Sequence, residues 1–393
     1  MILAFALYKY FPFGGLQRDF LRIALECQKR GHRVLVFTTC WQGEQPGGFD
    51  IRFLKVSGHS NHARMKSFQQ EVSKALAHQP EVTLVGFNKM PGLDIYYAAD
   101  TCYLDKAQSK GWWYRLTPRF RHYKAFEEAV FSQESKTVSL LISALQKPVF
   151  QHYYHTPEER IHLLPPGISR DRCRPDNADA DAIRAEFRKA FALTDEDKLV
   201  LMVGSGFKTK GLDRAIKAIA SLPAHQKQST RFFVMGQDKQ KPFESLAKQL
   251  GIEHQLRFFA GRDDVPRFLL GADLLIHPAY NENTGTVLLE ALVAGLPVLT
   301  TDLCGYAHYI RDAKAGTVLP SPFNQGSLNE ALSTMLESEH WLEWQNNALA
   351  FSRSEDLYSL PEQAADVIIE QADRKSGKNA WPTPSNQSLK SYL

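Results

Sequence analysis

The hydrophobic pattern alternates between short apolar runs and longer amphipathic segments, and this alternation occurs twice along the chain. Short apolar runs predict buried parallel strands, and apolar positions spaced three and four apart predict helices. In the first such helix, Leu16, Phe20 and Ile23 share one face, and Gly31 ends it. The predicted strands are Ile2–Leu7, Val34–Thr38, Ile51–Val56, Val82–Phe87, Ile95–Ala99, Val138–Ile142, Leu199–Val203, Arg231–Met235, Leu256–Phe259, Leu274–His277 and Val298–Thr300.

The turn Leu164–Gly167 and the polar run Arg170–Asp181 interrupt this alternation and predict an interdomain linker. Two strand–helix series joined by such a linker predict an α/β protein with two Rossmann-like domains that face each other across a deep cleft. We assign residues 1–165 to the N-terminal domain, together with a C-terminal helix at about 355–372, and residues 166–354 to the C-terminal domain. The polar tail 374–393, with its Pro, Ser and Asn, is predicted to be disordered.

Composition narrows the functional classes. With 393 residues and 44% apolar content, the chain can build two cores. A formal charge of +4 argues against a nucleic-acid partner. Five scattered cysteines without a CxxC favour a reducing cytosol and argue against zinc. No stretch approaches 18 apolar residues, and the run Met1–Leu7 is too short for a signal peptide, so a cytoplasmic location is expected.

The segment after the strand Leu274–His277 carries the strongest chemical signal. It places Glu282 in a loop, Gly285 at the start of a helix, and Glu290 eight residues after Glu282. A helix N-terminus at the end of a parallel strand can hold anions and sugar hydroxyls. The E-x7-E spacing resembles the donor-sugar motif of retaining nucleotide-sugar glycosyltransferases of the GT4 class. An ordinary strand-to-helix turn is the alternative interpretation.

The spacing of the two glutamates excludes one chemistry. On one helix they would lie about 12 Å apart. A retaining glycosidase needs its two carboxylates about 5 Å apart, and an inverting one roughly 6.5–9.5 Å. Glu282 and Glu290 therefore suit separate contacts along an extended ligand.

The first strand-to-helix loop contains Gly14 and Gly15, which let backbone amides approach a phosphate at a helix N-terminus. The pattern is not G-x-G-x-x-G, and no suitably placed acid follows, which argues against a nicotinamide cofactor. Asp19, one turn into the helix, would face the cleft or cap the first turn.

A glycine-bounded loop after Leu199–Val203 contains Lys208 and Lys210. A lysine there is a candidate to hold a diphosphate leaving group, and solvation explains Lys208 more readily than Lys210. Arg172, which follows the proline turn, is a second candidate cation or a surface residue.

Four longer strings resemble the WaaG/RfaG-type enzymes of lipopolysaccharide core assembly. They are Tyr8–Phe20, Gly86–Asp94, Cys304–Ile310 and Asp356–Pro361, and the resemblance runs from residue 1 to about 372. It implies a GT-B fold and transfer of a sugar from a UDP-sugar to heptose I of the lipopolysaccharide inner core, with retention of anomeric configuration. It also implies a cytoplasmic enzyme that is peripheral on the inner membrane.

The resemblance implies a role for each candidate residue. Gly14 and Gly15 would lie at the diphosphate, with the Gly15 amide donating to it. Glu282 would hold sugar hydroxyls and Glu290 the ribose diol. Lys210 and Arg172 would neutralise the departing UDP. Backbone amides would come from Gly285, Thr286 and Val287. Asp19 would lie close to the donor sugar, and Asp100 close to its anomeric carbon. Ser205 stands where the wider class often has an arginine, a departure for which Arg172 would compensate.

No metal or other cofactor is expected beyond the UDP-sugar donor substrate. Lys210, Arg172 and two helix N-termini would balance the diphosphate charge. Asp179 and Asp181 resemble the D-x-D of metal-dependent glycosyltransferases, but helix N-capping explains them better.

The segment Tyr103–Lys124 interleaves aromatic and basic residues around a single acid, Asp105. This pattern suits contact with anionic inner-membrane lipids. The alternative is a helix pair that packs its aromatic residues into the core.

The donor sugar stays open at this point. The resemblance alone favours glucose, the more frequent donor in this family. N-acetylgalactosamine stays the alternative, because small residues beside Glu282, such as Asn283 and Thr284, discriminate weakly by size. A UDP-sugar epimerase, a non-catalytic binding protein and a structural scaffold are the competing classes. None of the three explains both the membrane-directed segment and the candidate chemistry.

Overall fold

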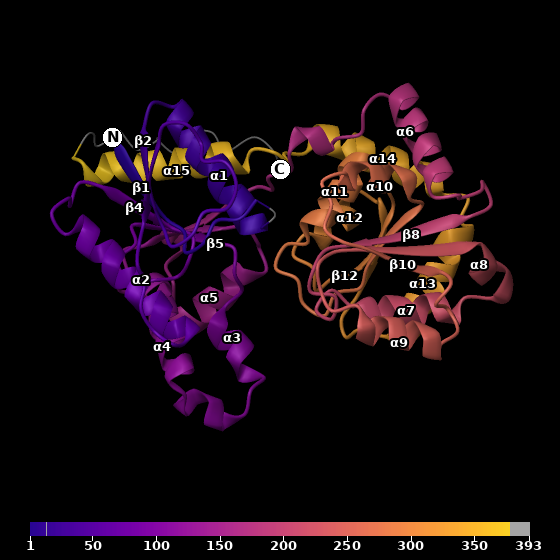
Figure 1. The fold of residues 1–393 in the computed structure, drawn as a ribbon, viewed down its shortest axis with the longest axis horizontal. Coiled ribbons are helices and arrows are strands. Elements are labelled where there is room, and N and C mark those ends of the chain that lie inside the picture. Colours follow the sequence, from indigo (N-terminus) through magenta and orange to yellow (C-terminus); the bar gives the residue numbers. More distant parts are fainter. Residues whose placement is uncertain (13, 378–393) are drawn as a thin grey trace, which may run out of the picture. The chain divides into compact units, whose positions relative to one another are not determined.

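The computed structural model describes residues 1–12 and 14–377, and the chain divides into two compact units (Figure 1). Of the described residues, the N-terminal unit contains those of Met1–Leu141, Gln146–Leu164 and residues 360–377. The C-terminal unit contains Ile142–Leu145 and Pro165–Ser359. Each unit is a parallel sheet covered by helices, which is the Rossmann-like arrangement that the sequence predicts.

The sheet of the N-terminal unit has seven strands in the order β3-β2-β1-β4-β5-β6-β7. From β1 the chain adds strands in one direction, then returns to β4 and adds strands in the other, so the topological switch point lies between β1 and β4. The strands are β1 (Ile2–Ala6), β2 (Arg33–Thr38), β3 (Phe49–Phe53), β4 (Thr83–Gly86), β5 (Ile95–Ala98), β6 (Val138–Leu141) and β7 (Ile161–Leu163).

The helices of this unit include one from the far end of the sequence, α15, which packs against α1. Ion pairs from Arg30 to Asp366 (2.5 Å) and from Lys375 to Asp94 (2.7 Å) join it to the unit. The helical segments are α1 (Gly15–Lys29), α2 (Asn61–Leu76), α3 (Tyr103–Gln108), the short turn η1 (Trp112–Leu116), α4 (Pro118–Phe131), α5 (Gln146–Tyr154), the turn η2 (Glu158–Arg160) and α15 (Leu360–Lys375).

The sheet of the C-terminal unit has six strands in the order β10-β9-β8-β11-β12-β13, with its switch point between β8 and β11. Successive residues of β8 point to opposite faces, so Leu199 and Leu201 join one core and Val200 and Met202 the other. The strands are β8 (Lys198–Val203), β9 (Thr230–Met235), β10 (Leu256–Phe259), β11 (Leu274–His277), β12 (Val298–Thr301) and β13 (Gly316–Leu319).

Helices cover both faces of this second sheet, which explains why its strands are mainly apolar. One core layer includes side chains of α6, α10, α11, α12 and α14, and the other those of α7, α9 and α13. The helical segments are η3 (Arg170–Arg172), α6 (Asn177–Ala190), α7 (Leu212–Ser221), α8 (Ala224–Ser229), α9 (Lys241–Gln249), α10 (Val265–Gly271), α11 (Thr286–Ala294), α12 (Ala307–Asp312), α13 (Gln325–Glu337) and α14 (Trp341–Ser354).

Most predicted strands are confirmed to within a few residues, but three expectations need correction. The run Arg170–Asp181 is not simply a linker, because it contains η3 and the first turns of α6 and lies within the C-terminal unit. The C-terminal helix begins at Leu360, where Pro361 suits a first turn. Arg374 and Lys375 end this helix, so they are not part of the tail, and residues 378–393 lie outside the described residues.

Candidate active site

In the C-terminal unit, the loops that follow the two strands at the switch point bring Lys210 and Glu282 together. Lys210 follows β8 and Glu282 follows β11, and the Lys210 Nζ lies 2.5 Å from the Glu282 Oε2. Both side chains are about four-fifths buried. In open α/β sheets, ligands bind at the carboxyl ends of the strands beside the switch point, and this ion pair occupies that position.

Glycines allow the two loops to approach each other. Gly204 has a φ of +125°, and a Cβ there would lie 2.7 Å from the Lys210 Cε. Gly211 has a φ of +80°, and its Cβ would lie 2.0 Å from the Pro278 carbonyl oxygen. The backbone amide of Tyr280 donates to the Thr209 carbonyl at 2.8 Å. A larger residue at Gly211 would push the lysine loop away from the glutamate loop, and one at Gly204 would displace the Lys210 side chain.

The last residue of β11, His277, is fully buried beside the ion pair, and nothing in the sequence singles it out. Its Nε2 lies 3.8 Å from the Glu282 Oε2, which is too far for a hydrogen bond, and burial lowers the pKa of His277. Burial alone would raise the pKa of Glu282, but the charge and the hydrogen bond of the Lys210 ammonium lower it to about 2. Glu282 is therefore a carboxylate at neutral pH, and His277 is neutral.

A third loop, after β12, fixes the backbone around Glu282. The Glu282 amide donates to the Leu303 carbonyl at 3.1 Å, and the Gly305 amide donates back to the Glu282 carbonyl at 3.0 Å. The Tyr306 amide donates to the Thr284 carbonyl at 2.7 Å. A Cβ on Gly305 would lie 1.9 Å from the Asn283 carbonyl oxygen, so the string Cys304–Ile310 positions the glutamate loop.

Helix α11 begins directly after this loop. Gly285 adopts the left-handed conformation, with a φ of +81°, at the N-cap, and no side chain caps the helix. The first helical residues are Thr286 and Val287, whose amides have no intrahelical acceptor. Glu290, one turn further, is only 9% exposed and forms no ion pair with any described residue. The structure thus places these residues on one loop-to-helix segment, where an anion and hydroxyl groups can be held.

The other residues of the lysine loop have partners away from the ion pair. Lys208 is largely exposed and pairs with Asp213 at 2.7 Å, with its ammonium also 3.2 Å from the Tyr280 hydroxyl. The Ser205 hydroxyl accepts a hydrogen bond from the Gln237 amide at 3.0 Å. Lys208 therefore belongs to a surface network, as the sequence favours.

Arg172 is not brought into contact with the lysine–glutamate pair. It lies on η3 and lines a cavity of about 450 Å³ that also contains Asp263 and Asp264. No ion pair joins it to Glu282 in the part of the chain that the structure describes, and its nearest carboxylate is Asp171, at 3.9 Å. Its proposed contact with a diphosphate thus stays a prediction.

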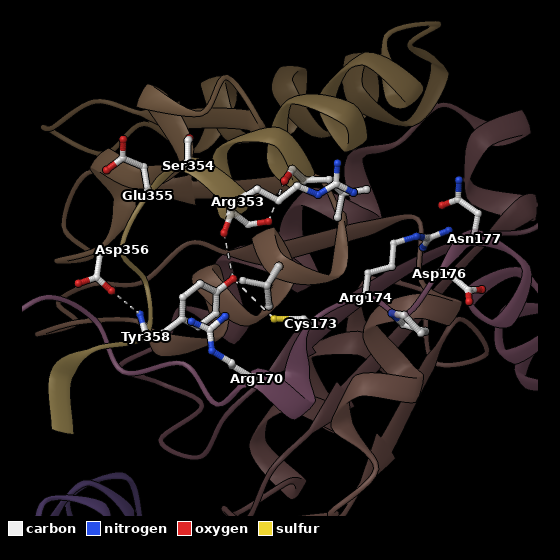
Figure 2. Close-up of a pocket in the computed structure, with 14 residues that line it drawn as sticks. Arg170, Cys173, Arg174, Asp176, Asn177, Arg353, Ser354, Glu355, Asp356 and Tyr358 are labelled. Carbon is white, nitrogen blue, oxygen red and sulfur yellow. Dashed lines mark hydrogen bonds between the residues drawn. The ribbon is translucent and has the colours of Figure 1, made fainter. Parts of the chain in front are cut away.

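Neighbours of Arg172 line a second cavity, of about 730 Å³, within the C-terminal unit (Figure 2). The guanidinium of Arg170 lies 4.4 Å from the Tyr358 ring, and the Tyr358 hydroxyl is 3.6 Å from the Cys173 Sγ. The lining contains three arginines and three acids, so the cavity has no net charge to attract a diphosphate. The charged lining residues are Arg170, Arg174, Arg353, Asp176, Glu355 and Asp356.

In the N-terminal unit, Gly14 and Gly15 lie at the start of α1, directly after the loop that follows β1. A Cβ on Gly14 would lie 1.9 Å from the Gln17 side chain and 2.7 Å from the Phe11 ring. A Cβ on Gly15 would meet no atom within 4 Å, and no side chain caps α1. A side chain at Gly14 would therefore have to displace Gln17 and Phe11, whereas a side chain at Gly15 would enter open space.

Asp19 and Asp100 lie on separate segments of the N-terminal unit. The Tyr97 hydroxyl, at the end of β5, donates to the Asp19 Oδ2 at 2.7 Å. Burial raises the pKa of Asp19, although this hydrogen bond and the nearby Arg22 oppose it. Asp100, just after β5, is exposed at the rim of a cavity of about 390 Å³. The sequence alone does not reveal the part played by Tyr97, because this residue lies in an apolar strand.

The segment Tyr103–Lys124 divides into buried and exposed aromatic residues. Tyr103, Tyr114 and Phe120 pack together in a small cluster. Trp112 and Trp113 are 77% and 62% exposed. Core packing therefore explains only part of the aromatic pattern. Separately, none of the described helices combines the length and apolarity needed to cross a bilayer.

Among the described residues, no three His, Cys, Asp or Glu side chains gather where they could hold a metal ion. The D-x-D pair lies in the first turns of α6, where Asp176 is the N-cap and accepts from the Asp179 amide at 3.1 Å. The helix is therefore capped by Asp176 rather than by Asp179 or Asp181, and the Asp181 carboxylate pairs with Arg174 at 3.3 Å.

Comparisons with known proteins agree with this architecture. The profile of Glycosyl transferases group 1 matches residues 183–350. The chain is 50% identical over 370 residues to the lipopolysaccharide glucosyltransferase WaaG of Escherichia coli K12, covering 94% of this chain and 98% of that protein.

Two solved structures are similar to the whole chain. A crystal structure of WaaG, a glycosyltransferase involved in lipopolysaccharide biosynthesis, superposes with a TM-score of 0.87 at 48% identity, covering 93% of this chain and 99% of that one. HepE of Anabaena, in complex with UDP and glucose, superposes with a TM-score of 0.71 at 16% identity, covering 94% and 100%, and shares the fold alone. The two Rossmann-like units are those of a GT-B enzyme, and the chain belongs to the WaaG family of glycosyltransferases.

Proposed function

We propose that this enzyme transfers a hexose from a UDP-sugar to heptose I of the lipopolysaccharide inner core, with retention of configuration and without a metal. The lysine–glutamate pair at the switch point carries the proposal, because it sets a cation beside a carboxylate at the N-terminus of α11. The closely similar Escherichia coli protein is a lipopolysaccharide glucosyltransferase, which supports the acceptor class.

Once a UDP-sugar binds, Lys210 and Glu282 would each contact a different part of it. Lys210 turns its ammonium from Glu282 to the diphosphate, where negative charge develops as UDP departs. Glu282 is then free to accept hydrogen bonds from sugar hydroxyls, and its low pKa keeps it ionised. Glu290 would accept from the ribose diol. Loss of a single such charge-stabilising group typically costs about 10²–10³ in rate.

Retention follows if the acceptor attacks the same face that UDP leaves. In that case an oxygen of the leaving phosphate takes the acceptor proton, and no protein nucleophile is required. Asp19 and Asp100 would lie near the sugar and orient it, while the Gly15 amide donates to the diphosphate. Open space in front of Gly15 suits this approach.

Metal independence rests on positive charge from the protein itself. Lys210 lies on the loop beside Glu282, the amides of Thr286 and Val287 begin α11 just after that glutamate, and Arg172 would add a further cation. These groups can stabilise a diphosphate as a divalent ion does. A transfer reaction that survives a chelator is the expected result.

Glucose is the favoured donor sugar, and N-acetylgalactosamine is the alternative. The relative from Escherichia coli is named a glucosyltransferase, which supports glucose. Asn283 and Thr284, beside Glu282, are in the segment that would contact the sugar. Replacing either side chain can therefore alter the preference between donor sugars.

The proposal also places the enzyme on anionic lipids of the inner membrane, from the cytoplasmic side. Trp112 and Trp113 are exposed beside Arg115, which is also exposed. Exposed indoles flanked by cations suit the headgroup region of an anionic bilayer.

The test is transfer of radiolabelled sugar from UDP-glucose, UDP-galactose, UDP-N-acetylglucosamine and UDP-N-acetylgalactosamine to heptose-terminated lipopolysaccharide, with and without EDTA. We expect one donor to react and EDTA to have no effect. Acceptors truncated after successive heptoses identify the heptose used, and NMR of the product gives the anomeric configuration. Turnover of a UDP-sugar without any transfer would overturn the proposal in favour of an epimerase.

Membrane contact has its own test. Cosedimentation with vesicles that contain anionic phospholipid should retain the protein, and zwitterionic vesicles should not. Trp112→Ser with Trp113→Ser should lower retention about tenfold, because each indole buries apolar area in the bilayer. Leu342→Ser, an exposed apolar residue on α14 of the C-terminal unit, is the control and should have no effect.

A further inference from the structure

A cavity of about 390 Å³ in the N-terminal unit has the charge and shape of an anion-binding pocket, and we call it the basic pocket. It lies where the loops after β4 and β5 meet α3 and α4, at the carboxyl ends of the strands. Asn88 belongs to the first of these loops and accepts a hydrogen bond from the Tyr8 amide at 2.9 Å, which ties the pocket to the switch point of the sheet.

The charges that line the basic pocket are unbalanced. Four cations face one acid, Asp100. The ammonium of Lys89 is neutralised by the buried Glu127, at 2.5 Å. Within residues 1–12 and 14–377, no ion pair neutralises Lys106, Lys110 or Arg119. Three cations thus remain available to a ligand that enters the pocket.

The tyrosines of the pocket lie beside its cations, which lower the pKa of Tyr114, whereas burial raises the pKa of Tyr103 and of Tyr123. The Tyr103 and Tyr114 hydroxyls lie 2.8 Å apart, and the Lys110 ammonium is 4.2 Å from the Tyr114 ring. Burial would raise the pKa of Tyr114, but the Tyr103 hydroxyl, Lys110 and Arg119 lower it overall. Phenol hydroxyls and ring faces are also the groups that bind the hydroxyls and apolar faces of a sugar.

We propose that the basic pocket binds an anionic substituent, most simply a phosphate, on the acceptor saccharide. Lys106, Lys110 and Arg119 contact the anion, while Tyr103 and Tyr123 contact the sugar that carries it. Because Asp100 stands at the rim of the same pocket, an acceptor held there has its sugar next to a candidate catalytic residue. This inference rests on the proposed function, since it specifies the chemistry of the acceptor.

The basic pocket shares the segment Tyr103–Lys124 with the surface assigned to the membrane, but the exposed indoles of that segment lie outside the pocket. Trp112 and Trp113 are exposed and do not line it, whereas Tyr114, between them and α4, is buried at its wall. A lipid phosphate and a saccharide phosphate share the same chemistry, so the test must separate the two sources. Soluble probes without vesicles serve this purpose.

Direct binding is the first arm of the test. The full chain is titrated with a hexose phosphate, inorganic phosphate and the uncharged methyl hexoside, and binding is followed by NMR or calorimetry. We expect the hexose phosphate to bind best and the neutral sugar to bind at least tenfold more weakly. Lys110→Ala should weaken the hexose phosphate roughly tenfold, because it removes a charge-assisted hydrogen bond. Arg121→Ala, exposed on α4 outside the pocket, is the matched control and should change nothing.

Transfer kinetics are the second arm. Removing phosphate from the acceptor with a phosphatase should lower kcat/KM about tenfold for the wild-type enzyme. For Lys110→Ala, kcat/KM should be the same on treated and untreated acceptor. Lys110→Arg should restore part of the difference. Equal rates on both acceptors, with no preference for the hexose phosphate, overturn this inference and leave the proposed function intact. Failure to transfer to any heptose acceptor overturns the proposed function itself, while the binding arm still reports on the pocket.

Discussion

The lysine–glutamate pair and the basic pocket lie on two similar folds but differ in how their charges are balanced. Lys210 and Glu282 neutralise each other at 2.5 Å and are mostly buried. In the basic pocket, Lys106, Lys110 and Arg119 are exposed, with no ion pair to any described carboxylate. Both groups follow strands at the carboxyl edge of a parallel sheet. The fold therefore fixes where ligands bind, and the local pairing of charges differs between the units.

The difference indicates how each region meets its ligand. The lysine–glutamate pair must separate before Lys210 can bind a diphosphate. The free energy of that binding therefore depends on the positions in which the surrounding loops hold the two side chains. Free cations attract an anion at long range and adapt by moving flexible side chains. We therefore expect substitutions at the pair to act on the rate of transfer, and those at the pocket to act on acceptor affinity and to weaken with salt.

The largest effect is expected at Lys210. Lys210→Met should lower kcat by about 10²–10³, because the leaving diphosphate loses its cation. Lys208→Met, two residues away, should change kcat less than threefold, since Lys208 is exposed and paired with Asp213. Steady-state kinetics with saturating acceptor measure both. Equal losses in the two variants would show that general loop charge, rather than the pair, is responsible.

The pH dependence of stability tests the ionisation of Glu282. Its folded pKa of about 2 lies below the ordinary 4.5, a difference worth on the order of 3 kcal/mol. Because the pKa is depressed by folding, this contribution is fully present above about pH 4.5 and is lost as the pH falls towards 2. The free energy of unfolding of wild type should therefore exceed that of Glu282→Gln at pH 7, and the gap should narrow below pH 5.

Urea denaturation at a series of pH values measures this gap. The control is Glu186→Gln, an exposed carboxylate on α6, for which the gap should stay small throughout. A constant difference between wild type and Glu282→Gln from pH 7 down to pH 3 would contradict the ionised pair.

A smaller effect is expected from substitutions of Gly14 and Gly15 at the start of α1, and the two should act on different properties. Gly15→Ala should raise the donor KM about tenfold without lowering Tm, because the methyl group enters open space that a phosphate would occupy. Gly14→Ala should lower Tm, because its Cβ would meet Gln17 and Phe11. Thermal melting and donor titration separate the two. A loss of stability in Gly15→Ala with unchanged KM would show that Gly15 has only a packing role.

Much of the fold can be predicted because most of its strands are mainly apolar and are separated by turn residues. The strands β7 and β13 escape prediction because each lies at the edge of its sheet and is only partly buried, which weakens the apolar signal. The first turns of α6 resemble a linker in the sequence because they are polar and exposed.

The residues of the candidate site can be predicted one at a time, but their contacts cannot. Lys210 and Glu282 each follow a strand, yet only the order β8-β11 brings them together. His277 looks like the polar end of a buried strand, and only its 3.8 Å approach to Glu282 distinguishes it. Trp112 and Tyr114 are two residues apart, and the helical turn between Gly111 and Thr117 decides which is buried.

The central claim is that Lys210 and Glu282 separate to hold different parts of the donor. The most direct measurement is a structure of the enzyme with an unreactive UDP-sugar, such as UDP-2-fluoroglucose. The account predicts the Lys210 Nζ within hydrogen-bonding distance of a phosphate oxygen and the Glu282 carboxylate on a sugar hydroxyl. A donor bound with the ion pair still closed, or bound elsewhere, would contradict it.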